Sequence, residues 1–310
     1  MNKRGRMPEN VLTLVATAAA SAVIAGAVDE ATRAIAHLGA EIAGTDWLAD
    51  GVAGDIAFDE LSPDLADAAA RAAIAQKYGA APIDLFAQPV AGRRKALLVA
   101  DMEATIIANE MLDELADLRG LRPQISAITA RAMNGDLDFV AALSERVALL
   151  KDLPEGALRE VATRIRINPG AAALVATMRA NGAYTALVSG GFHVFADDIK
   201  AKLGFDVAVA NDLIVTDGKL SGAVREPIRS REAKLETLMT LAAERRLALA
   251  TTLAVGDGAN DLPMIEAAGL GVAYHAKPIV AETARWRIDH ADLTALLYAQ
   301  GYRRSEIVEA

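Results

Sequence analysis

The stretch Leu97-Leu98-Val99-Ala100-Asp101-Met102-Glu103-Ala104-Thr105 decides the fold, because its apolar run stops at a carboxylate and a second carboxylate follows two residues later. Short apolar runs bounded by charge and followed by helical periodicity are typical of buried strands in a parallel sheet. In open α/β sheets the ligand binds beyond the carboxyl ends of the strands. We therefore expect Asp101 to lie at a ligand site, although many strands end in Asp.

Two later stretches repeat this pattern. An apolar run at 184–188 is followed by Ser189-Gly190-Gly191, and another at 252–255 is followed by Gly256-Asp257-Gly258-Ala259-Asn260-Asp261. Strands that share one parallel sheet would bring these acids, the hydroxyl and the glycines to the same edge. Gly256-Asp257-Gly258 alone could be an ordinary tight turn, but its combination with the other two strand ends favours a ligand site.

Helical patterns alternate with these strands. Helices are expected at 171–181, 193–203, 231–246 and 293–298, further short strands at 272–274 and 287–289, and a strand pair around Asp217-Gly218-Lys219. Repeated β-then-α units of this length predict an α/β fold, in which a doubly wound parallel sheet is connected by right-handed crossovers.

An inserted helical cap is predicted at about 108–166, between the first two core strands. Directly after Thr105, apolar residues recur at helix spacing, namely Ile106, Met111, Leu112, Leu115 and Leu118. Further helices are expected at 123–133, 138–149 and 155–165. Inserts of this kind close over small substrates and exclude water.

Residues 1–90 form a separate unit in which strands and helices follow the order βαββαβ. The expected ranges are 11–15, 18–38, 40–49, 51–58, 63–78 and 83–86. Asp50-Gly51 favours a hairpin turn, and Ser62-Pro63 supplies an N-cap with proline at the first helical position. The order predicts a ferredoxin-like α+β domain, joined through a linker at 89–95 to a second domain at 95–310. Two roles are open for the unit: an amino-acid-binding regulatory domain, or a packing module that could form a homodimer.

The N-terminus also has features of a secretory signal, since Lys3, Arg4 and Arg6 precede an uncharged run at 11–28. However, alanine and threonine make up much of that run, and Glu9 interrupts the approach from the basic residues. A strand followed by a helix is therefore favoured. No other stretch is long enough to span a membrane.

Composition excludes several function classes. The 310 residues carry a net charge of −9, which disfavours a nucleic-acid or anionic-membrane surface. The chain has no cysteine, so disulfides, thiol catalysis and thiolate zinc sites are excluded. These properties are compatible with a cytoplasmic location.

The residues at the three strand ends can support phosphoryl transfer. Asp101, Asp257 and Asp261 offer oxygen ligands that suit a hard cation such as Mg²⁺. Asp101 is the natural nucleophile, whose attack on phosphorus would give an aspartyl-phosphate. Such a reaction needs mainly alignment and charge neutralisation, which the cation, Lys234 and Ser189 can supply. Judged alone, Lys234 would be interpreted as a solvated helix lysine.

These motifs, together with Lys234, resemble the four motifs of the haloacid dehalogenase superfamily, and among its members those of the phosphoserine phosphatases. The resemblance spans roughly residues 97–297. The N-terminal unit is similar only to the ACT-like accessory domain that some members carry. It implies a haloacid dehalogenase-like phosphatase domain with a helical cap.

The resemblance also reaches the cap. Glu110 matches the residue that binds the substrate ammonium in the family, and Arg146, in Arg146-Val147-Ala148-Leu149-Leu150, matches the residue that binds the substrate carboxylate. An Arg fork suits a carboxylate geometrically, and one acid with one base fits an amino-acid zwitterion. Met133 and Phe139 match apolar cap positions near the substrate. Judged alone, Glu110 would be a first-turn helix acid and Arg146 a member of a surface ion pair.

The chain departs from the family at one motif position, because Glu103 stands where family phosphatases carry Asp. In the family this position is the general acid/base and coordinates the cation through its backbone carbonyl. We therefore expect an active but slowed phosphatase. The resemblance assigns catalysis to Asp101, Glu103 and Lys234, substrate binding to Glu110, Met133, Phe139, Arg146, Ser189, Gly190, Gly191, Lys234 and Asn260, and Mg²⁺ binding to Asp101, Glu103, Asp257 and Asp261.

Three functions follow as hypotheses. The first is magnesium-dependent hydrolysis of O-phospho-L-serine to L-serine and phosphate, the last step of serine biosynthesis. The second is a phosphatase or phosphotransferase for another small phosphorylated metabolite. The third is a catalytically weak phospho-amino-acid sensor, which only Glu103 favours. The otherwise intact nucleophile, phosphate-binding and metal positions argue against the third.

Overall fold

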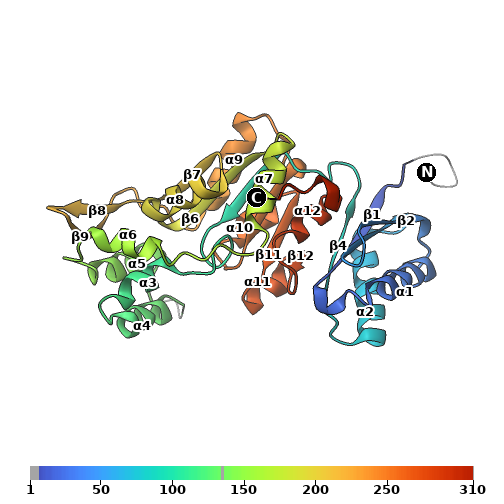
Figure 1. The fold of residues 1–310 in the computed structure, drawn as a ribbon, viewed down its shortest axis with the longest axis horizontal. Coiled ribbons are helices and arrows are strands. Elements are labelled where there is room, and N and C mark those ends of the chain that lie inside the picture. Colours follow the sequence, from blue (N-terminus) through green and yellow to red (C-terminus); the bar gives the residue numbers. More distant parts are fainter. Residues whose placement is uncertain (1–6, 134–135, 310) are drawn as a thin grey trace.

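A computed structural model describes residues 7–133 and 136–309 of the chain. Figure 1 shows three parts in a row: an N-terminal α+β unit, a central parallel sheet with helices, and a helical cap at the far end. The predicted fold class is therefore confirmed. The basic residues Lys3, Arg4 and Arg6 lie outside the described residues, as do 134–135 of the cap.

The N-terminal unit is a four-stranded antiparallel sheet with two helices on one face. Its strands have the order β2-β3-β1-β4, which is the arrangement of a βαββαβ sandwich. Leu12 and Leu14 of β1 point toward the helices and are fully buried there. The elements are β1 (Asn10–Ala16), a short 3₁₀ helix (Ala18–Ala20), α1 (Ile24–His37), β2 (Glu41–Ala49), β3 (Ala53–Asp59), α2 (Pro63–Tyr78) and β4 (Ile83–Pro89).

Local sequence explains most of these boundaries. The strand expected in the uncharged N-terminal run is present as β1, and Ser62 caps α2 by accepting a hydrogen bond from the Leu65 amide at 3.4 Å. The helix expected from residue 18 begins only at Ile24, because a 3₁₀ helix and a turn precede it. Alanine-rich sequence has no N-cap residue that would fix the start of the helix.

The central sheet consists of six parallel strands in the order β12-β11-β10-β5-β6-β7. Its strands are β5 (Leu97–Asp101), β6 (Tyr184–Phe192), β7 (Val207–Asn211), β10 (Thr252–Gly256), β11 (Leu270–Tyr274) and β12 (Trp286–Ile288). The helices around it are α7 (Ala171–Ala180), α8 (His193–Leu203), α9 (Glu232–Glu244), α10 (Leu262–Ala267), α11 (Pro278–Thr283) and α12 (Ala295–Ala299), with short 3₁₀ helices at Leu249–Thr251 and Arg304–Glu306. The sequence did not predict β7, α10 or α11.

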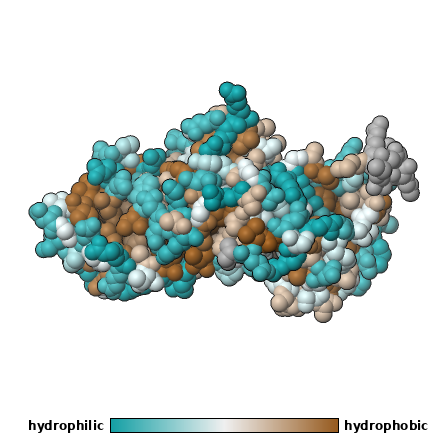
Figure 2. All heavy atoms as spheres, turned by 45° about the horizontal axis from the view of Figure 1, so that its top comes forward, coloured by the Kyte–Doolittle hydropathy of each residue, from teal (hydrophilic) through white to brown (hydrophobic). Residues whose placement is uncertain are grey.

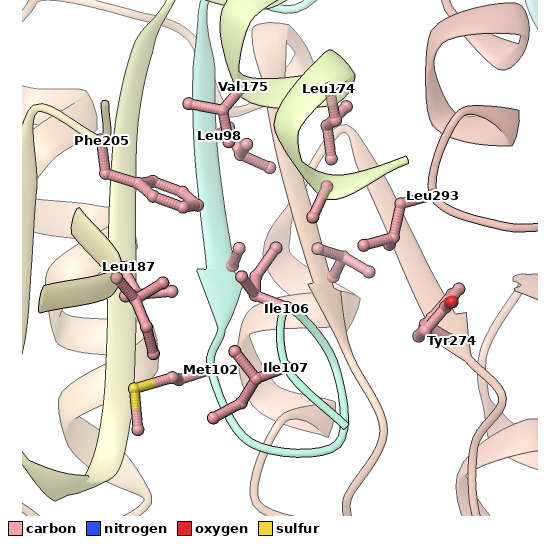
Figure 3. Packing of buried hydrophobic residues seen from close by; sticks show 14 of the residues in the cluster. Leu98, Met102, Ile106, Ile107, Leu174, Val175, Leu187, Phe205, Tyr274 and Leu293 are labelled. Carbon is pink, nitrogen blue, oxygen red and sulfur yellow. The ribbon is translucent and has the colours of Figure 1, made fainter. Parts of the chain in front are cut away.

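Alternate residues of β5 point to opposite faces of the sheet, and helices cover both faces. Leu98 packs with residues of α7 and α8, whereas Leu97 and Val99 pack with residues of α9 and α10. Figure 3 shows Leu98 beside Val175 of α7. Burial on both faces explains why β5 is a continuous apolar run.

The cap is built from helices inserted between β5 and α7, with a hairpin from the core added. The helices are α3 (Met111–Asp117), α4 (Arg122–Met133), α5 (Phe139–Ala148) and α6 (Gly156–Ala162), and the hairpin strands are β8 (Leu213–Thr216) and β9 (Lys219–Val224). The Leu220 amide donates to the Leu153 carbonyl at 2.8 Å, and the Asp152 amide donates to the Leu220 carbonyl at 2.9 Å. The predicted strand pair therefore belongs to the cap.

The prediction that the chain becomes helical directly after Thr105 is wrong. Residues 102–110 form a compact loop, and α3 begins only at Met111. The amides of Ile106 and Ile107 both donate to the Met102 carbonyl at 2.9 Å. Figure 3 shows these two isoleucines on the turn beyond β5, and both are fully buried. The helix-like spacing thus reflects a buried loop, which periodicity alone cannot distinguish from a helix.

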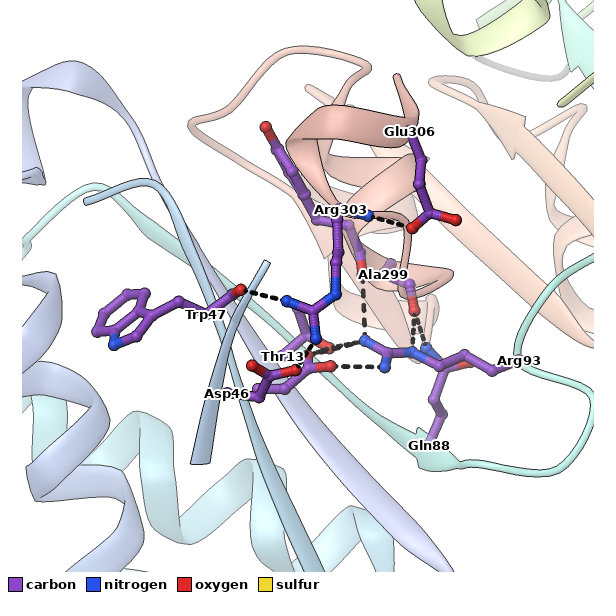
Figure 4. Close-up of polar contacts among 10 residues, drawn as sticks. Thr13, Asp46, Trp47, Gln88, Arg93, Ala299, Arg303 and Glu306 are labelled. Carbon is purple, nitrogen blue, oxygen red and sulfur yellow. Dashed lines mark hydrogen bonds and ion pairs between the residues drawn. The ribbon is translucent and has the colours of Figure 1, made fainter. Parts of the chain in front are cut away.

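The second face of the N-terminal sheet packs against the central part. Val15, Ala53 and Phe86 of that face belong to the same hydrophobic cluster as the core of the central sheet. Figure 4 shows the polar contacts there, in which Arg93 lies between the two parts. The Arg93 guanidinium donates to Asp55, Thr13 and the carbonyls of Ala299 and Tyr298.

Figure 2 shows hydrophilic and hydrophobic patches interspersed on one face. None of the helices in the described ranges combines the length and the apolar character that a membrane crossing requires.

Candidate active site

The three predicted strand ends meet at one edge of the central sheet. β5 lies between β10 and β6, and the register pairs Ala100 with Val255 on one side and Asp101 with Val188 on the other. Asp101, the loop after Gly256 and Ser189 are therefore neighbours. The prediction that these motifs share a sheet edge is correct.

Lys234 connects two of the acids. Its Nζ lies 2.6 Å from Asp101 Oδ1 and 2.5 Å from Asp261 Oδ1, and all three side chains are at least nine-tenths buried. α9 packs against β5 and β6 and brings the lysine to this point. The interpretation of Lys234 as a solvated helix lysine is thus excluded.

The buried charges perturb each other strongly. Burial lowers the pKa of Lys234, but the charges of Asp101 and Asp261 outweigh it, so the pKa lies above its ordinary value and the ammonium stays protonated. Burial and the charge of Asp261 raise the pKa of Asp101 well above its ordinary range. Two buried carboxylates that share one ammonium, with Asp257 beside them, carry excess negative charge, which a cation would relieve.

The donor set fits a hard divalent cation. Carboxylate oxygens of Asp101, Asp257 and Asp261 all lie within 4.8 Å of one another. Oxygen donors of this kind are the ligands that Mg²⁺ prefers. Asp261 is fixed by its contact with Lys234 and by the Gly258 amide, which donates to Oδ2 at 2.9 Å.

The close approach of neighbouring side chains requires glycine at the end of β10 and in the loop that follows it. A Cβ on Gly256 would lie 2.3 Å from Asp261 Cγ, and one on Gly258 would lie 2.4 Å from Asn260 Oδ1. Any larger residue would displace the acid or the amide. The glycines of this motif therefore do more than make a turn.

The segment Ser189-Gly190-Gly191 lies within β6 and faces the cavity with its glycines. Ser189 Oγ accepts a hydrogen bond from the Gly191 amide at 2.8 Å. A serine hydroxyl that accepts in this way still has its own proton to donate. Added methyl groups at Gly190 and Gly191 would meet Phe139 and Glu103, respectively, so larger residues in this segment would displace those two side chains.

A cavity of about 310 Å³ lies between this edge and the cap. Its lining includes the predicted residues Asp101, Glu103, Glu110, Phe139, Arg146, Gly190, Gly191, Lys234, Asp257 and Asn260. Ser189 and Asp261 are not in the lining but lie directly behind it. The side chain of Met133 lies outside the described part of the structure, and its prediction stays untested.

The two cap residues predicted to bind a zwitterion, Glu110 and Arg146, differ from each other in exposure and in position. Glu110 is exposed and immediately precedes α3, so it is the residue before the helix and not part of its first turn. Arg146 is half-buried on α5, and its Nε donates to the Ala142 carbonyl at 3.1 Å. Among the described residues Arg146 forms no ion pair, which argues against a surface salt bridge. Its two Nη groups are thus available to a ligand.

Glu103 is held against the cap. Its Oε1 accepts a hydrogen bond from the Met111 amide at 2.8 Å, at the first turn of α3. Burial and the charge of Glu110 raise the pKa of Glu103 to about 7. A carboxyl group with such a pKa can both release and accept a proton near neutral pH.

Lys277 is a cavity residue that the sequence analysis missed. It precedes α11, its Nζ lies 3.7 Å from Asp257 Oδ2, and its backbone amide donates to the Asp257 carbonyl at 3.2 Å. It lies 16 residues beyond the last motif acid, and no motif marks it. Only the fold brings the loop after β11 to this cavity.

Comparisons with known proteins agree with this architecture. A family model for haloacid dehalogenase-like hydrolases matches residues 98–266. The chain is 45% identical to a phosphoserine phosphatase from Streptococcus thermophilus over 64% of this chain and 93% of that protein. A phosphoserine phosphatase from Streptomyces coelicolor is 38% identical, and the match spans 77% of this chain but only 59% of that longer protein.

Solved structures extend the comparison. A haloacid dehalogenase family hydrolase from Salmonella enterica serovar Typhi has a TM-score of 0.80 and 29% identity, and the match covers 94% of this chain and 97% of that one, so the N-terminal unit is included. A substrate-bound phosphoserine phosphatase has a TM-score of 0.62 and 41% identity, over 66% of this chain and 98% of that one. The chain is thus similar to phosphoserine phosphatases, and it belongs to the haloacid dehalogenase-like hydrolase family.

Proposed function

We propose that this hydrolase cleaves O-phospho-L-serine to L-serine and phosphate through an aspartyl-phosphate on Asp101, with Mg²⁺ bound by the acids of the strand edge. The observation that carries the proposal is the cavity itself, which is lined by the buried Asp101–Lys234 pair and, on the cap, by Arg146, which forms no ion pair with any described residue. Relatives named phosphoserine phosphatases, at up to 45% identity, support the choice of substrate.

In the first half-reaction, a carboxylate oxygen of Asp101 attacks phosphorus and the bond from phosphorus to the serine oxygen breaks. Lys234 Nζ holds Oδ1 of Asp101 at 2.6 Å, which leaves Oδ2 as the attacking atom. Protonated Glu103 donates its proton to the departing serine oxygen. The products are serine and an aspartyl-phosphate.

In the second half-reaction, the Glu103 carboxylate accepts a proton from a water molecule that attacks phosphorus. The bond between Asp101 and phosphorus then breaks, so phosphate is released and both side chains return to their starting states. Mg²⁺ held by Asp101, Asp257, Asp261 and the Glu103 carbonyl would neutralise charge on the phosphoryl oxygens. Ser189, the Gly190 backbone amide and Asn260 bind the remaining phosphate oxygens, and the Gly191 amide, which donates to Ser189 Oγ, orients that hydroxyl.

Substrate recognition rests on the cap. Arg146 binds the serine carboxylate, Glu110 binds the ammonium, and Met133 and Phe139 cover the small side chain. Among the cavity-lining residues the acids Asp101, Glu103, Glu110 and Asp257 face the bases Lys234, Arg146 and Lys277. We expect Lys277, at the cavity wall, to moderate the negative charge that an anionic substrate meets.

A panel of phosphorylated metabolites, assayed for phosphate release with Mg²⁺, tests the proposal. Phosphoserine should be the best substrate, chelator-treated protein should be inactive, and Mg²⁺ should restore activity. Asp101→Asn should abolish turnover while circular dichroism stays unchanged. A better substrate without an amino-acid group would favour the second hypothesis, a phosphatase for another metabolite. Binding of phosphoserine without turnover would favour a sensor.

The N-terminal unit is proposed as an accessory domain at 1–90 that serves chiefly as a packing module, with the phosphatase domain at 95–310. The sheet face opposite α1 and α2 is occupied by the central part. A homodimer through this unit would therefore have to use its helices or the edge strand β2. A cytoplasmic location remains part of the proposal.

A further inference from the structure

Asn211, at the end of β7, uses its side-chain amide to join two segments of the candidate site. It is only 3% exposed. Its Nδ2 donates to the Gly190 carbonyl at 2.9 Å and to the Arg229 carbonyl at 3.2 Å, and its Oδ1 accepts from the Arg229 amide at 2.7 Å. Both amide protons and the oxygen are thus used, and all three partners are backbone groups.

The first segment is the peptide group between Gly190 and Gly191. Asn211 binds its carbonyl oxygen, and Ser189 Oγ accepts from its N–H at 2.8 Å. Because a peptide group is planar, two anchors on opposite sides fix its orientation. The glycines here have no side chains that could do so.

The second segment leads into α9. Arg229 lies five residues before Lys234, whose Nζ contacts Asp101 and Asp261. The two hydrogen bonds between Asn211 and the Arg229 backbone fix the position at which this segment approaches β6. The Asn211 side chain therefore links the Ser189–Gly191 segment to α9, the helix that carries Lys234.

We infer that Asn211 is a positioning residue for phosphoryl transfer, which keeps the Ser189–Gly191 loop and the Lys234 helix at the correct mutual distance around the phosphate. The inference deepens the proposed function and rests on it only in requiring that the site binds a phosphate group. Since the hydrogen bonds of the Asn211 side chain go to Gly190 and Arg229, and not to the cap residues proposed to bind serine, its loss should affect every phosphate ester alike.

The test is the isosteric change Asn211→Asp. It keeps the shape of the side chain and the oxygen that accepts from the Arg229 amide, but it replaces the donor Nδ2 by an oxygen that faces the carbonyl oxygens of Gly190 and Arg229. We expect kcat/KM to fall by the same factor, about 10- to 100-fold, for phosphoserine and for p-nitrophenyl phosphate, as is typical of a displaced catalytic group. The inhibition constant of inorganic phosphate should rise in parallel. Asn211→Ala, which adds no buried charge, should give the same equal losses.

Asn181→Asp is the matched control. Asn181 also donates from Nδ2 to a backbone carbonyl, that of Thr177 at 2.8 Å, but it ends α7 away from the cavity. This variant should keep wild-type kinetics. Folded Asn211 variants with kinetics within about twofold of wild type would overturn the inference, and so would a loss confined to phosphoserine, which would assign the effect to the cap.

A measurement on the wild-type protein covers the case in which neither variant folds. Hydrogen exchange of the Arg229 amide should slow when inorganic phosphate and Mg²⁺ are added, because phosphate orders the loop to which Asn211 is bonded. An unchanged Arg229 rate at saturating phosphate would contradict the coupling. If p-nitrophenyl phosphate is hydrolysed but phosphoserine is not, the proposed substrate is wrong while the Asn211 inference is still tested on the remaining ester.

Discussion

At the scale of single residues, Glu103 occupies the motif position at which the resemblance leads us to expect Asp. The structure gives the longer side chain a defined place, because Oε1 accepts the Met111 amide at the start of α3. The same carboxyl group lies close to Gly191. Glu103 therefore lies against both the cap and the Ser189–Gly191 segment. Two predictions concern this residue.

Replacing Glu103 by Asp tests whether the extra methylene slows catalysis. The expected result is an increase in kcat of about 10- to 100-fold, because a misplacement of about 1 Å can cost on the order of 10²-fold. Steady-state kinetics with phosphoserine measure the effect, and the Mg²⁺ concentration for half-maximal activity should hardly change. A lower kcat would mean that the contact with Met111 is needed and that the backbone has adapted to Glu.

Stability should depend on pH through Glu103. Burial and the charge of Glu110 raise its pKa from 4.5 to about 7, so between these pH values the native state holds a proton that the unfolded state lacks. The free energy of unfolding should therefore fall as the pH rises from about 5 to about 7, by on the order of 1–3 kcal/mol. Urea denaturation in the presence of a chelator measures it.

Glu103→Gln removes one titrating group and should reduce this slope without abolishing it, because burial also raises the pKa of Asp101 and of Glu110. The control Glu236→Gln changes an exposed residue of α9 and should keep the wild-type slope. An identical slope in Glu103→Gln and wild type would assign the proton to another group of the site.

At the scale of elements, we expect the cap helices to control which molecules reach Asp101. α5 carries both Phe139, which lies near Gly190, and Arg146, whose free Nη groups line the cavity. The hairpin β8–β9 is bonded to the cap through the loop at 152–155. The cap residues that line the cavity therefore belong to an insert outside the core sheet.

Arg146→Ala should raise the KM for phosphoserine by about 10- to 100-fold, the range expected for the loss of a hydrogen bond to a charged group. The KM for p-nitrophenyl phosphate, which has no carboxylate, should change by less than about twofold. Arg131→Ala on α4 is the control, because that arginine forms an exposed ion pair with Glu145. Equal losses on both substrates would make Arg146 a structural residue.

At the scale of the whole molecule, strands β1, β3 and β4 of the N-terminal sheet are buried on both faces, whereas β2 is partly exposed. One face packs on α1 and α2, and the other shares a hydrophobic cluster with the central part. Asp84 accepts hydrogen bonds from the amides of Asp289 and Ala291, and Trp286 Nε1 donates to the Ala87 carbonyl. The two parts therefore have the contacts of a permanent interface.

Arg93→Ala should destabilise this interface. The guanidinium is only 13% exposed and is paired with Asp55 at 2.6 Å, and removal of one partner of a buried pair costs about 3–5 kcal/mol. Arg94→Ala is the matched control, because Arg94 pairs with Glu306 at 46% exposure and should cost less than about 1 kcal/mol. Chemical denaturation measures both. Similar costs for the two variants would show that the Arg93 contacts contribute little to folding.

The sequence by itself determined five of the six strands of the central sheet, the polar motifs at the ends of three of them and the family, because apolar runs followed by Asp, Ser or Gly are local patterns. It also predicted the βαββαβ order of the N-terminal unit, from alternating strand and helix signals with Asp50-Gly51 and Ser62-Pro63 as boundaries. Boundaries were missed where local patterns are ambiguous, as in the buried loop at 102–110.

Only the tertiary structure decided which residues meet. Lys234, interpretable from sequence alone as a solvated lysine, proves to be the buried partner of Asp101 and Asp261. Asn211 and Lys277 carry no motif and reach the site because β7 and the loop after β11 end at the same sheet edge. The physical reason is that periodicity reports which face of an element is buried, whereas the partner on that face is set by packing between segments distant in sequence.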